Sequence, residues 1–387
     1  MKLAIVHDWL TGMRGGEKCL ERICRRFPDA RLFTLIHAAG SASPAIDRMS
    51  ITTSFLQRLP GADRHYRYLL PLMPRAIEAM KIPAEVDVVL SFSHAVAKGI
   101  ITPPGTVHIC YCFTPMRYAW HLRGEYFDTA DAHCAGARGF AGRIMRRPIS
   151  KVRDRFLDRL RDWDQATSHR VTQFVAASQT IRRRIHDCYG CDAKVIYPPV
   201  DTDYYTPDFR PRADFYLCVS ALVPYKRIDL AIAACNRLGR PLIVIGRGPE
   251  SRRLARLAGP TVRLLGWQPQ DVVRQHMRRC RALLFPGHED FGIVPVEAQA
   301  CGAPVIAFDQ GGVTESVVPP GRSTRGSGLF FKEPTPDSLA AAIRWFEQHP
   351  RRISADLARR GSERFAAGRF ERELVALLDQ ASGISVR

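Results

Sequence analysis

Two glutamates and the residues between them have the types and the spacing that most clearly indicate chemistry. Seven residues separate Glu289 from Glu297, and Gly292 and Pro295 lie among them. The apolar run at 282–285 predicts a buried parallel strand before this stretch. Pro295 predicts the first turn of a helix, because the missing N–H of proline is harmless there. The stretch therefore predicts a strand, a glycine-containing loop and a helix start that present two carboxylates.

The predicted helix start is suited to binding an anion. Free backbone N–H groups at the beginning of a helix bind phosphate, so Phe291, Gly292 and Ile293 are candidate contacts for a diphosphate. A carboxylate accepts two hydrogen bonds at once, so Glu289 and Glu297 could each bind neighbouring hydroxyls of a sugar. A diphosphate held between two sugars describes a nucleotide sugar.

The same stretch resembles a known signature. It reads EDFGIVPVEAQACGAPVIA followed by GGVTE, and it is similar to the E-x7-E signature of retaining glycosyltransferases of family 4. That resemblance implies an α/β chain with the GT-B fold, in which two doubly wound Rossmann-like domains face each other across a cleft. Resemblance to one branch of the family extends over the stretches MKLAIVHDWLTGMRGGEK, YRYLLPLMP, SHAVAKGIITPP and ICYCFTPMRYAW. That branch builds O-antigen, a part of lipopolysaccharide, and exopolysaccharide repeat units of bacteria, often by mannosyl transfer from GDP-mannose.

The length of 387 residues suits two domains. We expect an N-terminal acceptor-binding domain at 1–198 and a C-terminal nucleotide-sugar-binding domain at 199–367. The resemblance implies that a terminal helix at about 368–387 packs back on the first domain. Apolar runs predict strands at 2–6, 32–36, 86–92, 107–112, 174–177, 215–219, 242–245, 262–265, 282–285 and 304–308. The fifth of these is the last clear strand of the first domain. A helical region is expected at 66–80.

The first strand leads into a glycine pair, Gly15 and Gly16, at a helix start. These glycines could serve a tight turn or let the backbone approach a phosphate. The GGEK pattern resembles the loop that faces the donor diphosphate in GT-B enzymes, which favours the functional interpretation. His94 follows another strand, where ligands bind in open sheets, and it could donate a proton, contact phosphate or cap a helix. Lys98 and Arg117 lie close after strands and are candidate contacts for the acceptor.

The resemblance also identifies departures from the family pattern. Related sequences commonly place a histidine where this chain has Phe113, so Arg117 or His94 would have to replace it. An arginine and a lysine usually neutralise the donor diphosphate; Lys226 matches the lysine, whereas Ala221 stands at the arginine position. Arg227 could supply the missing charge.

The resemblance further implies that the residues after the strand at 262–265 hold the nucleotide base. Leu265 and Gly266 are the expected contacts. Trp267 could instead belong to the core.

A formal net charge of +19 and a pI near 9.9 call for an anionic partner. The basic stretch Arg138–Arg161 has helical apolar spacing, which is typical either of an ordinary surface helix or of a helix on an anionic membrane surface. An acceptor linked to polyprenyl diphosphate would favour the membrane. No nucleic-acid motif accompanies the charge, so nucleic acid is not an expected partner.

The remaining composition indicates a cytoplasmic protein. Apolar runs are too short to span a bilayer, and the N-terminus is unlike a signal peptide, so we expect a peripheral protein on the inner face of the cell membrane. Eleven cysteines are expected as buried reduced thiols. We expect no metal site, since the pair Asp201 and Asp203 lies in a proline-rich connector that reads as a turn.

These observations together predict a retaining, metal-independent hexosyltransferase with no cofactor other than its nucleotide-sugar co-substrate. The expected reaction transfers mannose from GDP-mannose to a polyprenyl-diphosphate-linked saccharide in surface polysaccharide synthesis. Three alternatives remain: a UDP-hexose-dependent transferase, a nucleotide-sugar epimerase, and a non-catalytic regulatory subunit with a transferase-like fold.

Overall fold

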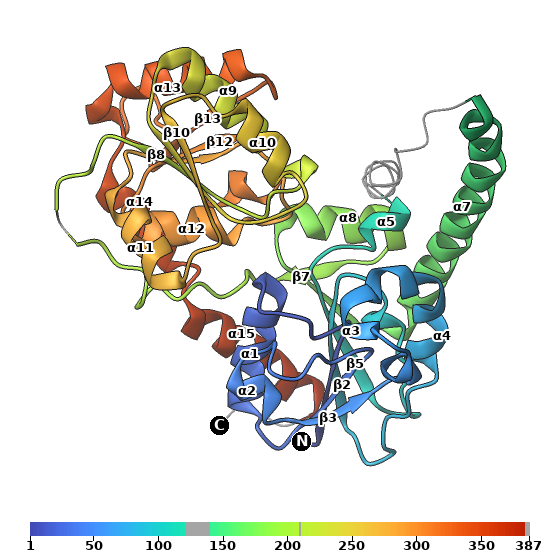
Figure 1. Ribbon diagram of the computed structural model, residues 1–387. Coiled ribbons are helices and arrows are strands. Elements are labelled where there is room, and N and C mark those ends of the chain that lie inside the picture. Colours follow the sequence, from blue (N-terminus) through green and yellow to red (C-terminus); the bar gives the residue numbers. More distant parts are fainter. Residues whose placement is uncertain (121–139, 209, 384–387) are drawn as a thin grey trace. The chain divides into compact units, whose positions relative to one another are not determined.

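The computed structural model describes residues 1–120, 140–208 and 210–383 of the chain (Figure 1). The described residues form two compact units. Unit 1 comprises those of Met1–Ile196 and of Glu371–Arg387, and unit 2 comprises those of Tyr197–Phe370. Each unit contains its own parallel sheet and its own cores.

Unit 1 is built on a seven-stranded sheet. Its strands are β1 Leu3–His7, β2 Arg31–Thr34, β3 Ser50–Thr53, β4 Val88–Ser93, β5 Val107–Cys112, β6 Gln173–Ala176 and β7 Ala193–Val195. They lie in the order β3-β2-β1-β4-β5-β6-β7, and every neighbouring pair is parallel. The central strands β1 and β4 are buried along their whole length, which explains their nearly continuous apolar sequence.

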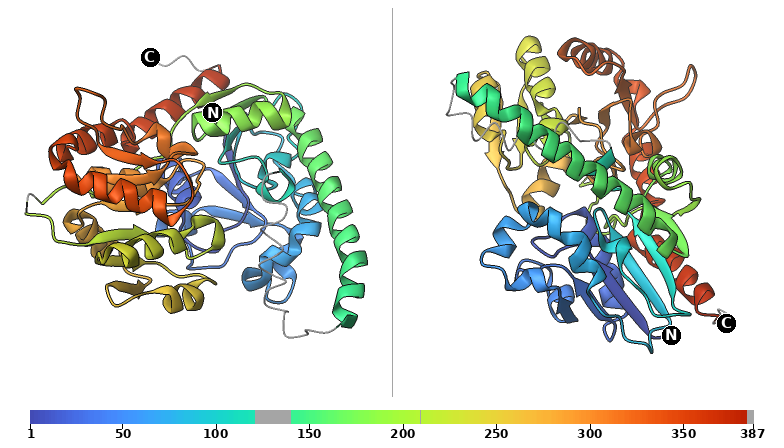
Figure 2. Two further views of the ribbon diagram at one scale, coloured as in Figure 1. Left: turned by 90° about the horizontal axis from the view of Figure 1, so that it is seen from above. Right: turned by 90° about the vertical axis from the view of Figure 1, so that its right-hand side faces the viewer.

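Helices cover both faces of this sheet (Figures 1 and 2). They are α1 Gly15–Arg26, α2 Pro44–Asp47, η1 Phe55–Arg58, α3 Ala62–His65, η2 Tyr66–Leu72, α4 Met73–Glu78, η3 Ala97–Gly99, α5 Arg117–Trp120, α7 Phe140–Ala166, η4 Thr167–Arg170 and α8 Gln179–Tyr189. The largest core packs η1, α3, η2, α4 and the end of α7 against one face of β1, β2 and β4. A second core is formed where α8 packs against β5 and β6.

Unit 2 is built on a six-stranded parallel sheet. Its strands are β8 Tyr216–Val219, β9 Leu242–Ile245, β10 Val262–Gly266, β11 Leu283–Phe285, β12 Val305–Phe308 and β13 Gly328–Phe331. Their order is β10-β9-β8-β11-β12-β13, again with parallel neighbours. One core joins α9 and α13 to one face, and another joins α11 and α12 to the opposite face.

The helices of unit 2 alternate with its strands. They are η5 Pro224–Lys226, α9 Ile228–Leu238, α10 Ser251–Leu257, α11 Gln270–Arg279, α12 Ile293–Ala300, η6 Gly312–Glu315, α13 Pro336–Gln348, η7 Pro350–Arg352, α14 Ala355–Glu363 and α15 Ala367–Ala381. Helix α15 starts in unit 2 and belongs to unit 1 from Glu371 onward. In unit 1 it contacts α1, where Arg22 Nη1 lies 3.5 Å from Glu371 Oε1.

The expected fold class is confirmed, because both sheets are parallel and doubly wound. Three short strands were not expected: β3, β7 and β13. The strand at 174–177 was expected to be the last clear one of the first domain, and the short strand β7 follows it. The expected helical region at 66–80 is divided into η2 and α4, because Pro71 lies inside η2 and Pro74 near the start of α4.

Candidate active site

The strand order of unit 2 reverses between β8 and β11, and the loops after these strands hold two predicted charged residues. Lys226 ends η5 after β8, and Glu289 follows β11. The Nζ atom of Lys226 forms an ion pair with Oε1 of Glu289, and the two side chains are 13% and 22% exposed. Ligands of open α/β sheets bind at such reversal points, beyond the carboxyl ends of the strands. The pair therefore marks the position where an anionic ligand could reach Lys226.

Glycines let these loops approach one another closely. A Cβ atom on Gly287 would lie 2.8 Å from Cα of Lys226, and one on Gly311 would collide with the carbonyl oxygen of Glu289. The N–H of Gly312 donates a hydrogen bond of 2.9 Å to that carbonyl. A side chain at Gly287 or Gly311 would force the loops apart and move the charged pair.

Helix α12 begins directly after this loop. Gly292 precedes it with a φ of +83°, a conformation that favours glycine, and no side chain of the described residues caps this end. Phe291 anchors the loop, since its buried ring packs 5.3 Å from that of Phe365. The first-turn N–H groups near Ile293 have no partner within the helix and can bind an anion.

Glu297 lies further along α12 and is 5% exposed. The hydroxyl of Tyr205 donates a hydrogen bond to it. Burial and then the charge of Glu297 raise the pKa of Tyr205 far above its usual value. The carboxylate is thus held in a fixed orientation.

Arg227 directly precedes helix α9 and has a φ of +50°, which is unusual for a residue with a side chain. Its Nε lies 3.3 Å from Oδ1 of Asp229, so its charge is shared with that carboxylate. Ala221, which lies in the loop after β8, is exposed.

A different arginine lies beside the position of Ala221. The carbonyl of Arg247, in the loop after β9, accepts a hydrogen bond of 2.9 Å from the N–H of Leu222. Its exposed side chain places Nε 3.9 Å from where a Cβ atom on Gly266 would lie. Arg247 therefore brings a cation to the end of β10, where Leu265 and Gly266 were expected to hold a base. Trp267 is 61% exposed, so the alternative that it belongs to the core does not hold.

In unit 1 the corresponding reversal lies between β1 and β4, and Asp8 joins the ends of these strands. Its Oδ1 accepts 2.7 Å hydrogen bonds from the N–H groups of Val96 and Ala97. Its Oδ2 accepts bonds of 2.7 and 3.0 Å from the N–H groups of His94 and Ala95. Burial alone would raise the pKa of Asp8, but the charge and hydrogen bonds of His94 lower it to about 2.

Asp8 also fixes the ring of His94. The Nδ1 atom lies 3.0 Å from Oδ2 of Asp8, and the ring is 28% exposed. Because the carboxylate accepts at Nδ1, this nitrogen carries a proton and Nε2 is left for another partner. Trp9 packs edge-on against the ring at 4.5 Å between centroids.

The predicted glycine pair starts α1 beside this histidine. A Cβ atom on Gly16 would lie 3.2 Å from the Phe113 ring and 3.8 Å from Cε1 of His7. His7 is fully buried, and its Nε2 lies 3.9 Å from Oε1 of Glu17 in α1. Gly15 and Gly16 thus lie at a helix N-terminus next to a buried histidine that faces a glutamate of the same helix.

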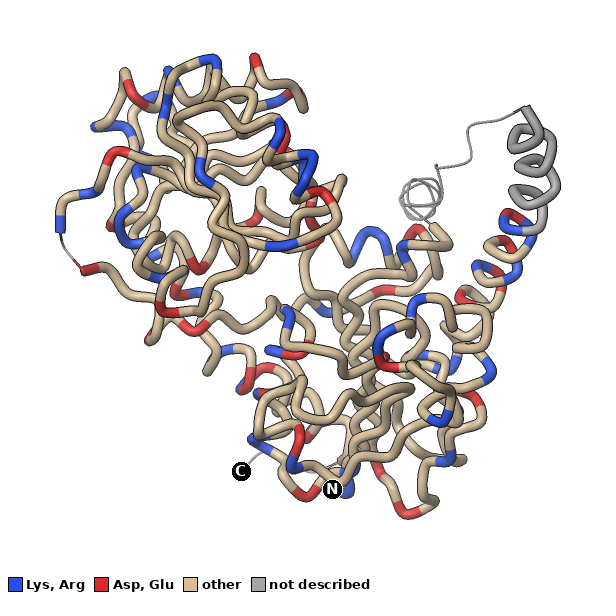
Figure 3. The backbone as a smooth tube through the Cα atoms, viewed as in Figure 1, with Lys and Arg blue, Asp and Glu red and all other residues tan. Residues whose placement is uncertain are grey.

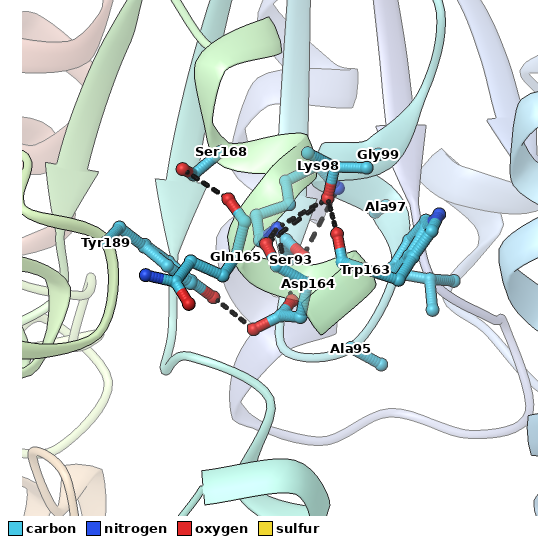
Figure 4. Close-up of polar contacts among 12 residues, drawn as sticks. Ser93, Ala95, Ala97, Lys98, Gly99, Trp163, Asp164, Gln165, Ser168 and Tyr189 are labelled. Carbon is cyan, nitrogen blue, oxygen red and sulfur yellow. Dashed lines mark hydrogen bonds and ion pairs between the residues drawn. The ribbon is translucent and has the colours of Figure 1, made fainter. Parts of the chain in front are cut away.

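Lys98, a candidate acceptor contact, is buried and paired within unit 1. Its side chain is 2% exposed and lies 3.1 Å from Oδ1 of Asp164 in α7 (Figure 4). Its Nζ also donates a hydrogen bond of 2.9 Å to Oγ1 of Thr167. The second carboxylate oxygen of Asp164 accepts bonds of 2.8 Å from Trp120 and from Tyr189. This buried cluster connects η3, α5, α7 and α8, so Lys98 has a structural role.

Two further predictions concern the region around α7. Arg117 is the first residue of α5, after β5, and is partly buried. Within Arg138–Arg161, the side chains before Arg153 lie outside the described residues. Figure 3 shows basic and acidic residues alternating along the described remainder, in which the charged residues are Arg153, Asp154, Arg155, Asp158, Arg159 and Arg161.

Three residues at these loops were not predicted as site residues from the sequence. Arg247 had a signal, because a basic residue between two glycines directly follows a predicted strand. Asp8 had a weaker one, as the first acidic residue after the first strand. Tyr205 had none, since only the folded chain brings it to Glu297.

The described residues contain no cluster typical of a metal site. Within these ranges, no group of three or more His, Cys, Asp or Glu could hold a metal ion. The cysteines within the described ranges are free thiols, and all but Cys191 are buried. No helix in this part of the chain has the length and apolar character needed to cross a membrane.

Comparison with protein families matches residues 207–364 to the family described as Glycosyl transferases group 1. A D-inositol 3-phosphate glycosyltransferase of Kineococcus radiotolerans is 30% identical over 235 residues, which cover 51% of this chain and 54% of that protein. An uncharacterized glycosyltransferase of Methanocaldococcus jannaschii is 31% identical over 57% of this chain and 66% of its own length. A GDP-mannose-dependent alpha-(1-6)-phosphatidylinositol monomannoside mannosyltransferase of Mycobacterium tuberculosis is 30% identical over 45% of this chain and 51% of its own. The chain thus spans about half to two thirds of the curated relatives that it matches.

Solved structures are similar over nearly the whole chain. Anabaena HepE, in complex with UDP-glucose, has a TM-score of 0.68 at 17% identity and covers 98% of this chain and 100% of its own. A sucrose-phosphate synthase of Thermosynechococcus elongatus has a TM-score of 0.70 at 15% identity, with both chains fully covered. At these identities the likeness establishes the fold, which is that of the GT-B glycosyltransferases.

Proposed function

We propose that this chain, whose residues 207–364 match the family described as Glycosyl transferases group 1, transfers a hexose from a nucleotide-diphosphate donor. The observation that carries the proposal is the charged pair Lys226–Glu289 beside the uncapped start of α12. Both lie where the strand order of the family-matched unit reverses. A cation and free N–H groups suit a diphosphate, and a carboxylate suits sugar hydroxyls.

In this proposal the donor diphosphate takes the place of Glu289 as the partner of Lys226. Glu289 is then free to accept hydrogen bonds from the hexose hydroxyls. The nucleotide ribose joins Tyr205 as a partner of Glu297, and the base contacts the backbone of Leu265 and Gly266. Donor binding is thereby an exchange of partners within groups that the fold already holds in place.

The proposed chemistry retains the configuration of the sugar and needs no metal. The bond between the anomeric carbon and the phosphate oxygen breaks while Lys226 and the start of α12 stabilise the negative charge that develops on the leaving diphosphate. The acceptor oxygen forms its bond to the same face of the anomeric carbon. Its proton passes to the leaving phosphate oxygen, so no protein base is required.

We assign a second cation to the donor site. Arg247 lies beside Leu222 and Gly266, so its guanidinium can contact the donor phosphates where the family arginine is replaced by Ala221. Arg227 is the poorer candidate, because it is paired with Asp229.

In unit 1, we assign His94 to contact the transferred sugar or its phosphate through Nε2. Asp8 keeps Nδ1 protonated and holds the ring at the carboxyl edge of the sheet. Phe113, which stands at the position of the family histidine, can offer only its ring.

We further propose GDP-mannose as the donor and a polyprenyl-diphosphate-linked saccharide as the acceptor, at the inner face of the cell membrane. Support for the donor comes from the mycobacterial relative, which is named as GDP-mannose-dependent. The reaction would belong to the synthesis of a bacterial surface polysaccharide.

A donor panel tests this assignment. Thermal unfolding is measured with GDP-mannose, other GDP-hexoses and UDP-hexoses, because a ligand that binds only the folded state raises its stability. GDP-mannose should give the largest shift, and Lys226→Ala should abolish it, while Lys332→Ala, an exposed lysine of the same unit, should not. A larger rise in unfolding temperature with a UDP-hexose would show that the donor is that UDP-hexose and not GDP-mannose. Turnover without any acceptor would indicate an epimerase, and the absence of any shift would favour the non-catalytic alternative.

A further inference from the structure

One segment of unit 1 exposes large apolar side chains to solvent. Among the described residues with large exposed apolar side chains, four of nine lie on the short helices η1, α3 and η2 or directly between them. They are Phe55, Leu59, Tyr68 and Leu72, which are 45%, 38%, 76% and 41% exposed. Exposed apolar side chains that gather in one place usually mark an interaction site. We call the exposed side of residues 55–75 the 55–75 surface.

The segment that exposes these side chains is packed firmly on unit 1 through its other side. The opposite side of the same helices is buried in the largest core of unit 1 through Leu56, Ala62, Tyr66 and Leu70. The segment is thus amphipathic, with one apolar side packed on the sheet and a second apolar set facing outward. Packing within the described chain accounts for the first set only.

The 55–75 surface is also strongly basic. Its exposed charged residues are Arg58, Asp63, Arg64, Arg67 and Arg75. The segment thus carries four exposed arginines and a single exposed carboxylate together with its exposed apolar side chains. On the described part of α7, by contrast, arginine and aspartate alternate (Figure 3). Charge complementarity to an anionic partner is therefore greater at the 55–75 surface than along this part of α7.

The segment adjoins the candidate site of unit 1. The ring of Tyr66 lies 5.0 Å from that of Trp9, which packs on His94. Arg14, directly before the glycine pair, places Nη1 3.5 Å from the hydroxyl of Tyr66. A partner bound to the outer side of this segment would thus lie one side chain away from the site loop.

We propose that the 55–75 surface docks on a membrane through anionic lipid headgroups. Arginines bind the headgroup phosphates, and Phe55, Leu59, Tyr68 and Leu72 enter the boundary between headgroups and acyl chains. Tyrosine suits this boundary because its ring is apolar and its hydroxyl remains hydrated. The inference rests on the proposed function in one respect, that a lipid-linked acceptor would be presented to unit 1 from this side.

Vesicle sedimentation tests the proposal with the full chain. Phosphatidylcholine vesicles are used with and without phosphatidylglycerol, at low and high salt. An apolar variant carries Tyr68→Ser and Leu72→Ser, and a charge variant carries Arg64→Glu and Arg75→Glu. The matched control carries Leu257→Ser, Arg252→Glu and Arg256→Glu on α10, where exposed arginines also flank an exposed leucine.

The unchanged protein should sediment with vesicles that contain phosphatidylglycerol, and less of it should sediment at high salt. It should remain in solution when the vesicles are pure phosphatidylcholine. The charge variant should bind at least about tenfold more weakly, since each arginine near an anionic surface contributes to binding. A clear loss is expected for the apolar variant and none for the control. Donor-induced thermal stabilisation should be the same in all four proteins, so a failure of the proposed reaction would be seen separately.

Two results would overturn the proposal. The first is vesicle binding by both surface variants that equals that of the unchanged protein. The second is an unchanged protein that ignores anionic vesicles but forms a dimer that the surface variants lose, because the partner would then be a second copy of the chain.

Discussion

At the scale of single residues, one basic side chain of each candidate site lies beside a carboxylate of the same unit. Lys226 is paired with Glu289, and His94 with Asp8. A paired charge costs less free energy to bury than a lone one, so the fold can hold these groups at partly buried positions. A diphosphate would compete for Lys226 and release the glutamate at the moment when sugar hydroxyls arrive. Donor recognition would then depend on the strength of this exchange.

Arg247 should contribute to donor binding although it departs from the family position. Arg247→Ala is expected to raise the donor KM about tenfold, because a charge-assisted contact to phosphate is lost. Steady-state kinetics against donor concentration measure this, with Arg263→Ala on β10 as the control for an exposed arginine nearby. An unchanged donor KM in Arg247→Ala would remove Arg247 from the site.

Asp8 should stabilise the fold and orient His94 at the same time. Asp8→Asn replaces one acceptor oxygen by an NH2 group that faces N–H donors, so the free energy of unfolding should fall by about 2 kcal/mol. Denaturant unfolding measures this loss, and NMR of the His94 ring nitrogens reports whether Nδ1 keeps its proton. Asp87→Asn is the control, because Asp87 accepts a single exposed bond from the N–H of Lys2. Equal stability of the two variants would contradict this role for Asp8.

At the scale of elements, apolar runs were sufficient to predict the strands that are buried on both faces. The unexpected strands lack that signal: β3 is half-exposed with the sequence SITT, β7 has three residues, and β13 begins with a glycine. Such short strands form because a neighbouring strand offers hydrogen-bond partners, which local sequence does not reveal. The role of Lys98 also depends on a partner that local sequence does not reveal. A lysine after a strand resembles a site residue until α7 supplies Asp164 from 66 residues away.

The cluster around Lys98 should be essential for the packing of α7. Lys98→Met leaves Asp164 buried without its cation and should lower the free energy of unfolding by about 3–5 kcal/mol. The double variant Lys98→Met, Asp164→Leu should recover part of that loss, because no charge then stays buried. Denaturant unfolding of both variants checks the prediction. A single variant as stable as the unchanged protein would show that the ion pair contributes nothing.

His108 should make the stability of unit 1 depend on pH. Its Nδ1 lies 3.0 Å from the carbonyl of Arg170 and its Nε2 lies 2.8 Å from Oγ of Ser91. Burial, assisted by the charge of Lys98 and opposed by the carbonyl of Arg170, lowers the pKa of His108 from 6.5 to about 4.

Between these two pH values the unfolded chain binds the proton and the folded chain does not, so stability falls as pH falls from 6.5 to 4. The His108 contribution to that loss is roughly 3 kcal/mol. Denaturant unfolding at a series of pH values measures it, and His108→Gln should flatten the curve in this window. A curve that is the same with and without His108 would contradict the prediction.

At the scale of the whole molecule, the sequence predicted the fold and one part of the site, for different reasons. Two parallel, doubly wound sheets follow from the alternation of apolar runs and helical periods. Glu289, Gly292 and Glu297 are neighbours along the chain, so local spacing was enough to group them. Asp8 with His94, and Arg247 with Gly266, are brought together only by the strand order within each sheet. Neither contact could be predicted before that order was known.

If Lys226 and Glu289 bind a nucleotide sugar for transfer, transfer itself can be measured directly. The unchanged protein is incubated with GDP-mannose and a polyprenyl-diphosphate-linked saccharide, and the products are analysed by mass spectrometry and by NMR of the new anomeric centre. We predict one added hexose with the configuration of the donor, equimolar GDP, and a rate that falls about 100-fold or more in Lys226→Ala but not in Lys332→Ala. No transfer from any GDP- or UDP-hexose by the folded protein, or an equal rate in Lys226→Ala, would contradict the claim.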